Sequence, residues 1–520
     1  MVSSADSSMG GAGAAAGRRP RLAVLAAVLL CSYAIAMETT VVSAAIPTVI
    51  RGFGGLSDLS WVFSAYLIAQ AVTMPLFGSA SDRLGRKGCY LVAAAVFFAG
   101  TLACGFAWDM LSLILFRVLQ GVGAGGLITV GTAALNDIIP QSSRGKYQAL
   151  GSAVWGIAAI SGPIVGAGIM TMLDWRYIFW INLPVVVVSA VLLGMFYQGR
   201  ASRDGAAGDG ASLPREQDDG DSDGSLALVP SLYLCAALLA AMIALVHGQS
   251  LVPWQWGLVA AVGGPAAALL WRSQRLSANP LIPRALLRAP IVTLAVVSAF
   301  LCGAIAMGLT VYVPSFAAIV LRADYLTISA TVAVMTLTWT FSGIGVGLLI
   351  KTGQHRPLAN AAAWAVLAGT LGLCQVAHQV HTAWPLLLMS GVLGIGLGAC
   401  SVVFSVTLQS TVDDTVRGSA TSLFYLSRML GQAIGVALCG GVMAGSDPAA
   451  RALMQQQSQH ATATDPAAAV QAMANAADLA IAMRSEFVLL FAMLAALALL
   501  QLLHALFTPS RSPVPAPVHS

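Results

Sequence analysis

Fourteen stretches of this chain are continuously apolar over about 20 residues, which is the length that an α-helix needs to cross a bilayer. Lipid accepts only helices and closed barrels, and barrel strands would alternate apolar with polar residues. We therefore expect an all-α polytopic membrane protein. The predicted spans lie at about residues 22–47, 60–79, 89–106, 110–135, 147–171, 177–197, 227–247, 252–271, 291–319, 325–350, 358–378, 384–408, 418–443 and 486–507.

The composition supports the membrane assignment and excludes several other classes of protein. Of the 520 residues, 58% are hydrophobic and 9% are charged, whereas soluble domains carry about 25% charged residues. The net charge of +5 is spread over short loops, so nucleic acid is not an expected partner. The 8 cysteines form no CxxC pair, and no HExxH, GxSxG or GxxxxGK[ST] motif occurs. We expect neither an enzyme nor a metal or organic cofactor.

The distribution of cations predicts the orientation in the membrane. An even number of spans brings both termini to one side, and Lys and Arg are enriched on the cytoplasmic side. With a cytoplasmic N-terminus, the inside segments hold 19 of the 26 Lys and Arg residues and the outside segments hold 5, while the other two lie within spans. We therefore expect a multi-pass protein of the inner or plasma membrane with both termini in the cytoplasm.

A faint internal repeat predicts two related halves. Arg417-Gly418 repeats Arg144-Gly145 after 273 residues, and the predicted loops holding Gly85 and Gly353 are 268 residues apart. Repeated halves around a central site are a known transporter architecture. The predicted organisation is a disordered cytoplasmic tail (1–20), an N-terminal six-helix bundle (21–197), a cytoplasmic linker (198–226), two inserted helices (227–271), a C-terminal six-helix bundle (272–507) with a long external loop (444–485), and a cytoplasmic tail (508–520).

Glu38 is the only acidic residue deep inside any predicted span. A carboxylate near the middle of a bilayer costs several kcal/mol, because burial disfavours the charged form. Such a group is expected to carry a proton or to pair with a cation, and Arg117 in the fourth span is the natural partner. We predict that Glu38 and Arg117 couple transport to protons. A purely structural ion pair would explain the same two residues.

The loop after the second span has a specific spacing of glycines and charges, which a general excess of cytoplasmic cations does not explain. It resembles the cytoplasmic loop of the major facilitator superfamily, and the run from Arg117 through Gln120 to Gly126 resembles that superfamily's fourth-span motif. The resemblance implies that the loop gates the cytoplasmic side. Asp137, at the end of the fourth span, either joins this gate or is a solvated acid at a helix end. The predicted gate comprises Gly78, Asp82, Arg83, Gly85, Arg86, Lys87 and Asp137.

The fifth span carries a glycine and proline pattern that resembles the motif of antiporters within the superfamily. Its residues are Gly156, Gly162, Pro163 and Gly166. Glycines four residues apart let helices approach closely, and proline permits a kink. Ordinary helix packing would also explain this pattern.

Three further segments resemble the fourteen-span drug:proton antiporters, and the likeness covers about residues 22–507. These segments are Met37–Pro47, Asp174–Pro184 and Pro280–Pro283. The resemblance implies export of amphipathic small molecules by alternating access, driven by the proton gradient. Two features depart from the family: many members have Asp where this chain has Glu38, and the C-terminal half has no acid in its equivalent of the gate, where Ile350, Lys351, Gln354 and His355 stand.

Large or polar side chains within the spans are candidates for the substrate cavity. Aromatic faces suit apolar cations and planar molecules, and a single deep acid favours monocationic, neutral or weakly anionic amphiphiles. Packing or lipid-facing roles are equally consistent for each candidate, and Arg428 could also extend to the membrane surface. The candidates are Tyr66, Gln70, Gln120, Trp155, Tyr312, Trp339, Phe404, Tyr425 and Arg428.

Three other functions stay open on sequence grounds. A dedicated exporter of one endogenous metabolite, such as an antibiotic or a siderophore, would have the same motifs. A proton symporter working in the import direction disagrees with the fifth-span motif, and a transport-inactive membrane sensor disagrees with the intact loop and fourth-span motifs. The expected partners are the lipid bilayer, protons and an amphipathic small molecule. The sequence identifies no adaptor or outer-membrane partner and assigns no role to the 444–485 loop.

Overall fold

The computed structural model describes residues 9–53, 59–139, 144–197, 224–247, 251–276, 289–350, 355–379, 382–412, 417–444 and 466–507. Predictions for residues 1–8, 198–223, 277–288 (including the Pro280–Pro283 segment), 351–354, 445–465 and 508–520 lie outside these ranges. Helices are the only regular elements among the described residues. They are α1 (Met9–Phe53), α2 (Leu59–Leu84), α3 (Arg86–Gly105), α4 (Met110–Ile138), α5 (Arg144–Met172), α6 (Tyr177–Trp180), α7 (Leu183–Phe196), α9 (Gly224–His247), α10 (Pro253–Leu276), α12 (Pro290–Ile319), α13 (Tyr325–Leu349), α14 (His355–Gln379), α15 (Trp384–Thr411), α16 (Arg417–Ala444) and α18 (Pro466–Leu506).

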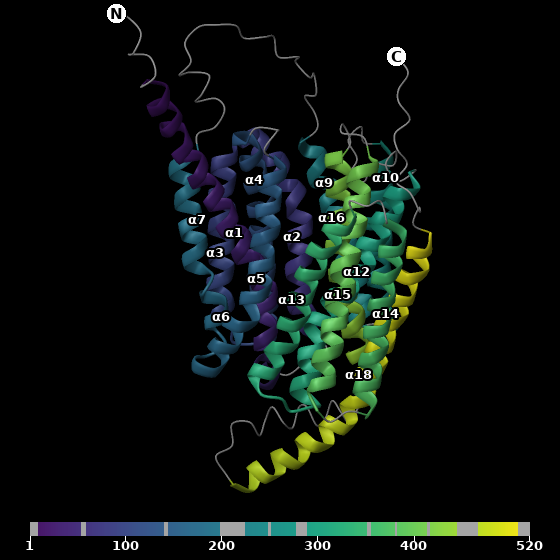
Figure 1. The fold of residues 1–520 in the computed structure, drawn as a ribbon. Coiled ribbons are helices and arrows are strands. Elements are labelled where there is room, and N and C mark those ends of the chain that lie inside the picture. The colour runs from purple at the N-terminus through teal and green to yellow at the C-terminus, as the bar shows by residue number, and fades with distance from the viewer. Residues whose placement is uncertain are drawn as a thin grey trace, which may run out of the picture.

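The predicted all-helical membrane fold is confirmed. Among the described residues, twelve segments are long and apolar enough to cross a membrane, with α6 and α7 forming one of them. The helices α9 and α10 bring the number of long helical segments to the fourteen that the sequence predicts. The helices run roughly alongside one another, and α1 begins toward the same end of the bundle at which α18 finishes (Figure 1).

Two helices extend beyond the predicted span boundaries. The helix α1 begins at Met9, inside the stretch for which the sequence predicts disorder. At the opposite end of the bundle, the first turns of α18 project away from the other helices (Figure 1). These turns contain residues 466–485, which the sequence assigns to the external loop and which are also rich in alanine.

The helices form two groups that meet along several helix pairs. In the first group α1 packs on α5 and α7, while α2 and α3 pack on α4. In the second group α12 packs on α16 and α18, while α13 and α14 pack on α15. The groups meet where α2 contacts α16, α5 contacts α13, and α1 contacts both α12 and α13. Hydrogen bonds cross this junction: Ser64 donates to the Ala433 carbonyl over 3.0 Å, and the hydroxyls of Thr48 and Tyr325 are 3.1 Å apart.

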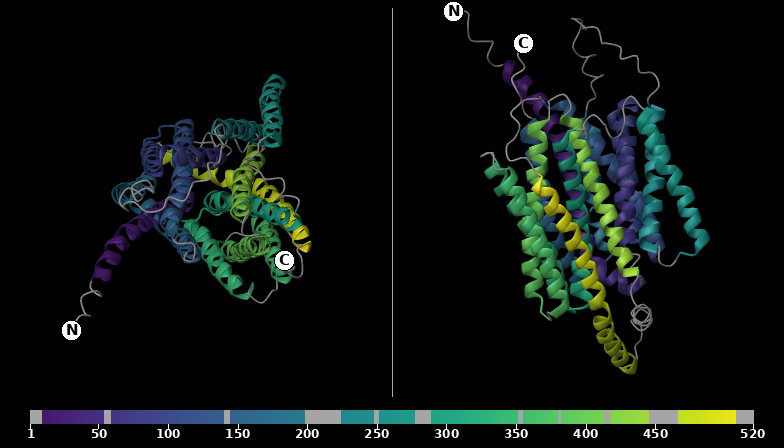
Figure 2. Two further views of the ribbon diagram at one scale, coloured as in Figure 1. Left: turned by 90° about the horizontal axis from the view of Figure 1, so that it is seen from above. Right: turned by 90° about the vertical axis from the view of Figure 1, so that its right-hand side faces the viewer.

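The helices α9 and α10 form a hairpin at the edge of the bundle. They pack on each other, α9 also contacts α2 and α16, and the view from above shows the pair standing out from the rest (Figure 2). The Trp61 indole on α2 donates to Nε2 of His247 at the end of α9 over 3.1 Å, and the two rings stack. The hairpin therefore lies against the junction of the two groups from outside.

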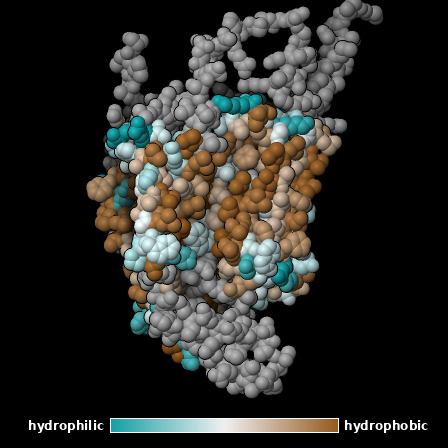
Figure 3. Space-filling model, turned by 180° about the vertical axis from the view of Figure 1, so that it is seen from behind, coloured by the Kyte–Doolittle hydropathy of each residue, from teal (hydrophilic) through white to brown (hydrophobic). Residues whose placement is uncertain are grey.

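The outer surface has the pattern expected of a protein in lipid. Figure 3 shows a broad apolar band on one face, with hydrophilic residues gathered above and below it. Large apolar side chains on several helices are exposed, including Leu115, Ile164, Leu258, Phe341 and Leu388. Lipid tails solvate such side chains as well as a protein core would, so this exposure requires no soluble partner.

Candidate functional site

A fully buried ion pair lies inside the first group of helices. Glu38 on α1 and Arg117 on α4 have no exposed surface, and Nη1 of Arg117 lies 2.7 Å from Oε1 of Glu38. The same nitrogen donates to Oε1 of Gln120 over 2.6 Å, and Nε of Arg117 donates to the Val62 carbonyl over 3.1 Å. The guanidinium also lies over the Tyr66 ring, with Cζ 4.2 Å from the ring centroid. The charges that the sequence marks as partners are therefore in contact.

Asn182 is the second partner of Glu38, and the sequence analysis did not identify it. Its Nδ2 donates to Oε2 of Glu38 over 2.6 Å. Asn182 lies at the interruption between α6 and α7, where Asn182 N–H bonds to the Phe179 carbonyl in a tight turn. The sequence does contain a signal for this role. Asn182 is a polar residue in an apolar run, immediately before Leu183-Pro184, and a buried polar side chain needs a hydrogen-bond partner.

Hydrogen bonding extends the network and leaves some capacity unused. Gln120 Nε2 donates to the Thr101 hydroxyl on α3 over 2.9 Å, so four helices and the α6–α7 turn converge here. Three buried polar atoms of this network have no hydrogen-bond partner in the structure: Nη2 of Arg117, the Tyr66 hydroxyl and Oδ1 of Asn182. Both carboxylate oxygens of Glu38 accept hydrogen bonds. The neighbouring side chains have hydrogen-bonding atoms without partners, and these could form new bonds when Glu38 is protonated.

A second charged cluster lies at the end of the bundle where α1 begins. Nε of Arg86, at the start of α3, is 2.7 Å from Oδ2 of Asp137 at the end of α4. The Tyr197 hydroxyl, just after α7, donates to the same oxygen over 2.8 Å. The contact of Arg86 with Asp82 is longer, with 3.5 Å between Nη2 and Oδ1, and the Asp82 side chain is 69% exposed. Gly85 links α2 to α3 with a φ of 93°, a conformation that favours glycine.

The predicted gate residues thus differ in their contacts: some form ion pairs and others are exposed. Arg86 and Asp137 form the close ion pair, Asp82 adds a longer contact, and the side chains of Arg83 and Lys87 are exposed. A Cβ added to Gly78 on α2 would lie at ordinary contact distance from Thr129 on α4. Tyr197 joins this cluster without having been predicted.

We expect Asp137→Asn to loosen this cluster more than Asp82→Asn does. The first change removes the charge from a partly buried contact of 2.7 Å, whereas the second acts on an exposed contact of 3.5 Å. We expect a cost of about 1–2 kcal/mol for the first, which corresponds to about tenfold faster amide exchange in residues 83–89, and less than about twofold for the second. Hydrogen exchange in lipid nanodiscs measures both. Equal effects of the two variants would contradict this ranking.

The glycines of the fifth-span pattern face two different neighbours of α5. A Cβ on Gly162 would collide with the Thr40 hydroxyl on α1, and a Cβ on Gly156 would press against Thr340 on α13. Pro163 lies inside α5, and Gly166 is buried. The pattern therefore fits α5 between α1, which carries Glu38, and α13 of the other group.

We expect Gly162→Ala to destabilise the protein by about 1–3 kcal/mol, because the added methyl group must displace Thr40 or separate α1 from α5. The matched control is Gly168→Ala on the same helix, where a Cβ meets nothing within 4 Å. Alanine has the higher helix propensity, so this control should be neutral or stabilising. Thermal unfolding in detergent measures both variants, and similar melting temperatures for the two would show that the α1–α5 contact is not tight.

Two acids cap helices at the end of the bundle opposite the charged cluster. Asp109 accepts from the Ser112 amide over 2.7 Å and completes a capping box at the start of α4, the helix that carries Arg117. The hydrogen bonds from Ser112 hold the pKa of Asp109 below its usual value, so this cap stays charged in mildly acidic solution. Asp324 caps α13 by accepting from the Thr327 amide over 3.4 Å.

Comparison with known proteins identifies the family of this chain. The family model of the Major Facilitator Superfamily matches residues 28–436. The chain belongs to the Major Facilitator Superfamily. The predicted family membership is thereby confirmed, and this protein is a multi-pass membrane transporter of that superfamily.

Several relatives within the superfamily are named as efflux proteins. The chain is 26% identical to multidrug resistance protein 3 of Bacillus subtilis (strain 168), over 81% of this chain and 79% of that protein. It is 24% identical to the multidrug transporter protein MdtP of the same organism, over 81% and 75%. It is 26% identical to the efflux pump FUS6 of Gibberella fujikuroi, over 81% and 74%.

Solved structures of the superfamily share the fold at low sequence identity. A bacterial homolog of the human lysosomal transporter Spinster, in an inward-facing and unoccupied conformation, matches with a TM-score of 0.64 and 15% identity, covering 95% of this chain and 99% of that one. A D-xylose–proton symporter matches with a TM-score of 0.59 and 13% identity, covering 94% and 97%. These likenesses concern the fold alone.

The candidates for the substrate cavity occupy different environments in this superfamily member. Tyr66 and Gln120 belong to the Glu38 network, and Gln70 is buried against α4. Tyr312 on α12 and Phe404 on α15 are fully buried among core side chains. These five side chains are held by packing or by polar contacts.

The remaining candidates are more accessible. Trp155 and Tyr425 are about half exposed, whereas Trp339 is partly buried. The Arg428 guanidinium lies over the Trp339 ring, with Cζ 5.2 Å from the centroid, and this pair joins α16 to α13. A void of about 10 Å³ near Val42, Leu59, Leu113 and Phe179 has only apolar walls and is far too small for a drug-sized ligand.

Proposed function

We propose that this transporter is a drug:proton antiporter, which exports amphipathic small molecules by alternating access and takes up protons in exchange. The observation that carries the proposal is the fully buried contact of Glu38 with Arg117 and Asn182 inside the membrane-spanning part. An intramembrane acid is costly and marks proton or substrate pathways. The names of the relatives support efflux, and the glycine pattern of α5 supports antiport.

Protonation of Glu38 would change the contacts that hold α1 to its neighbours. A proton on Oε1 weakens the bond with Arg117, and a proton on Oε2 weakens the bond from Asn182. Arg117 then retains Gln120, the Val62 carbonyl and the Tyr66 ring on α2 and α4. The proton thereby alters the α1–α4 connection, and coupling follows if the two access states differ in that connection.

The cation distribution supports an orientation with both termini in the cytoplasm. In that orientation the cluster of Arg86, Asp137 and Tyr197 lies at the cytoplasmic end and holds α3, α4 and the end of α7 together. The cluster would stabilise closure on that side and release in the inward-open state. In this proposal the cluster closes the cytoplasmic end, and the Glu38 network binds the proton within the bundle.

The direct test is efflux from proteoliposomes that contain the purified protein and a fluorescent amphipathic dye. We expect an imposed pH gradient to drive dye movement, and we expect an ionophore that collapses the gradient to stop it. Movement that ignores the gradient would rule out proton antiport. Movement of a single endogenous compound in place of every dye tested would favour the dedicated exporter.

A further inference from the structure

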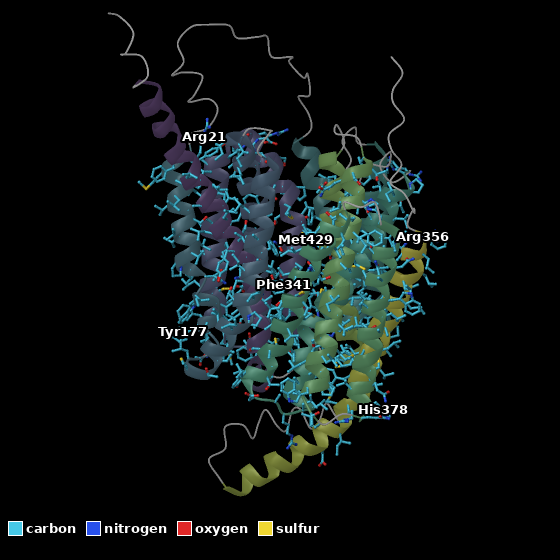
Figure 4. All side chains as sticks on the ribbon, viewed as in Figure 1. Arg21, Tyr177, Phe341, Arg356, His378 and Met429 are labelled. Carbon is cyan, nitrogen blue, oxygen red and sulfur yellow. The ribbon has the colours of Figure 1, made fainter. Side chains whose placement is uncertain are left out.

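Arg428, like Arg117, lies well inside a membrane span that the sequence predicts. It lies 11 residues after the first residue of α16, which corresponds to about 16 Å along the helix axis. Figure 4 labels its neighbour Met429 and also Phe341, two residues after Trp339, and both lie well within the length of the bundle. Asp413 and Asp414, before α16, lie outside the described residues.

Arg117 has a carboxylate partner, and the surroundings of Arg428 differ in this respect. Arg117 has a carboxylate, an amide oxygen, a backbone carbonyl and an aromatic ring as partners. Arg428 has the Trp339 ring, and its further neighbours are the Tyr425 hydroxyl and the Cys302 thiol. Among the residues that the structure describes, no carboxylate forms an ion pair with Arg428. Arg428 also retains some exposed surface.

Packing fixes both members of the Arg428–Trp339 pair. A Cβ on Gly303 of α12 would collide with the backbone of Arg428, and Ser427 donates to the Val296 carbonyl of α12 over 2.8 Å. In the same way, a Cβ on Gly398 of α15 would collide with the backbone of Trp339. Since α16 packs mainly on α12 and α13 mainly on α15, the pair bridges two helices that have different main neighbours.

An aromatic ring compensates a buried cation only in part. A cation–π contact contributes about 2 kcal/mol when it is well desolvated, less than the cost of a charge deep in the membrane. The planar fork of a guanidinium matches a carboxylate, sulfonate or phosphate group, and such charge-assisted bonds are the strong ones. An indole ring beside the fork offers a face for a planar apolar group. An anionic group would therefore complement the Arg428 guanidinium better than the ring alone does.

We propose that Arg428 and Trp339 form the binding site for the anionic group of an amphipathic aromatic acid, which is the class of substrate that this transporter carries. The inference rests on the proposed function for the transport step, but not for binding. The guanidinium binds the carboxylate or sulfonate, and Trp339 stacks on the aromatic part. The substrate anion and the coupling proton then occupy different groups of helices, with Arg428 in one and Glu38 in the other.

Binding of two probes with the same fluorophore and opposite charge tests the proposal. Dansylglycine carries a carboxylate and dansylcadaverine an ammonium group, and energy transfer from tryptophan reports binding to the protein in phosphatidylcholine nanodiscs. We expect wild type to bind dansylglycine at least about tenfold more tightly than dansylcadaverine. Arg428→Gln should remove that preference, Arg428→Lys should retain most of it, and the exposed Arg356→Gln should leave it unchanged.

Each outcome decides a separate point. Wild type that prefers dansylcadaverine overturns the proposal without any variant, as does a preference for dansylglycine that survives in a folded Arg428→Gln protein. Competition by added phosphatidylglycerol would show that Arg428 holds an anionic lipid headgroup instead. Gradient-driven efflux of a dye without dansylglycine binding would refute this site and leave antiport standing. Tight dansylglycine binding without gradient-driven efflux would support the site and refute antiport.

Discussion

Glu38→Gln should reduce gradient-driven efflux to the rate of protein-free liposomes, while dye binding stays within about threefold of wild type. Glutamine has the shape of glutamate and can still accept from Arg117 and donate or accept at Asn182, so the site should keep its structure. It cannot take up or release a proton at neutral pH. The measurement compares efflux under an imposed pH gradient with equilibrium binding of the same dye.

Glu38→Asp is the matched control, since aspartate keeps the titratable group and shortens its reach. With Arg117 at 2.7 Å and Asn182 at 2.6 Å, a shorter side chain cannot maintain both contacts unless α1 moves. We therefore expect efflux that is slower than wild type but still driven by the gradient. If Glu38→Gln also remains coupled to the gradient, Glu38 has a structural or substrate-binding role and the proton site lies elsewhere.

Arg117→Met should produce the largest loss of stability of any single change considered, about 3–5 kcal/mol. Removing one member of a fully buried ion pair leaves the other without compensation, and Arg117 also satisfies Gln120 and the Val62 carbonyl. Methionine has a long, adaptable side chain and fills much of the vacated volume, so the loss reports mainly the charge. Thermal unfolding of the purified protein in detergent measures the effect.

The double variant Glu38→Gln with Arg117→Met separates charge from packing. It removes both charges, so the unpaired carboxylate no longer contributes to the cost. We expect the double variant to be more stable than Arg117→Met alone, even though it carries one more substitution. A double variant that is equally unstable or less stable would mean that Arg117 acts through packing on Tyr66 and through its hydrogen bonds.

The Glu38–Arg117 contact was predictable because both charges lie inside apolar helices, where an unpaired charge is costly. The structure adds the geometry, including the occupation of both carboxylate oxygens. The role of Asn182 was not predictable in this way. An asparagine near the end of an apolar run has many ways to satisfy its amide, and only the interruption between α6 and α7 directs it toward α1.

The charged loop after α2 is a second case in which the sequence does not show which residues are in contact. Its spacing identified the family, yet it did not rank the contacts among Asp82, Arg86 and Asp137. Asp82 is nearer to Arg86 in sequence, but Asp137 is nearer in space because α3 and α4 pack closely along their length. The sequence also marked Arg428 only as a costly charge, and the structure brought Trp339 to it from another helix.

The sequence by itself determined the helical class, the number of long helices, the charges within the spans and the charged loop after the second span. The length of an apolar segment and the cost of a buried charge are properties of each segment alone. The tertiary structure alone decided which polar groups meet: Asn182 with Glu38, Tyr197 with Asp137, and Trp339 with Arg428. These pairs are 144, 60 and 89 residues apart in the sequence. Their contact depends on how helices pack, and in lipid that packing is set by small residues and complementary shape rather than by hydrophobicity.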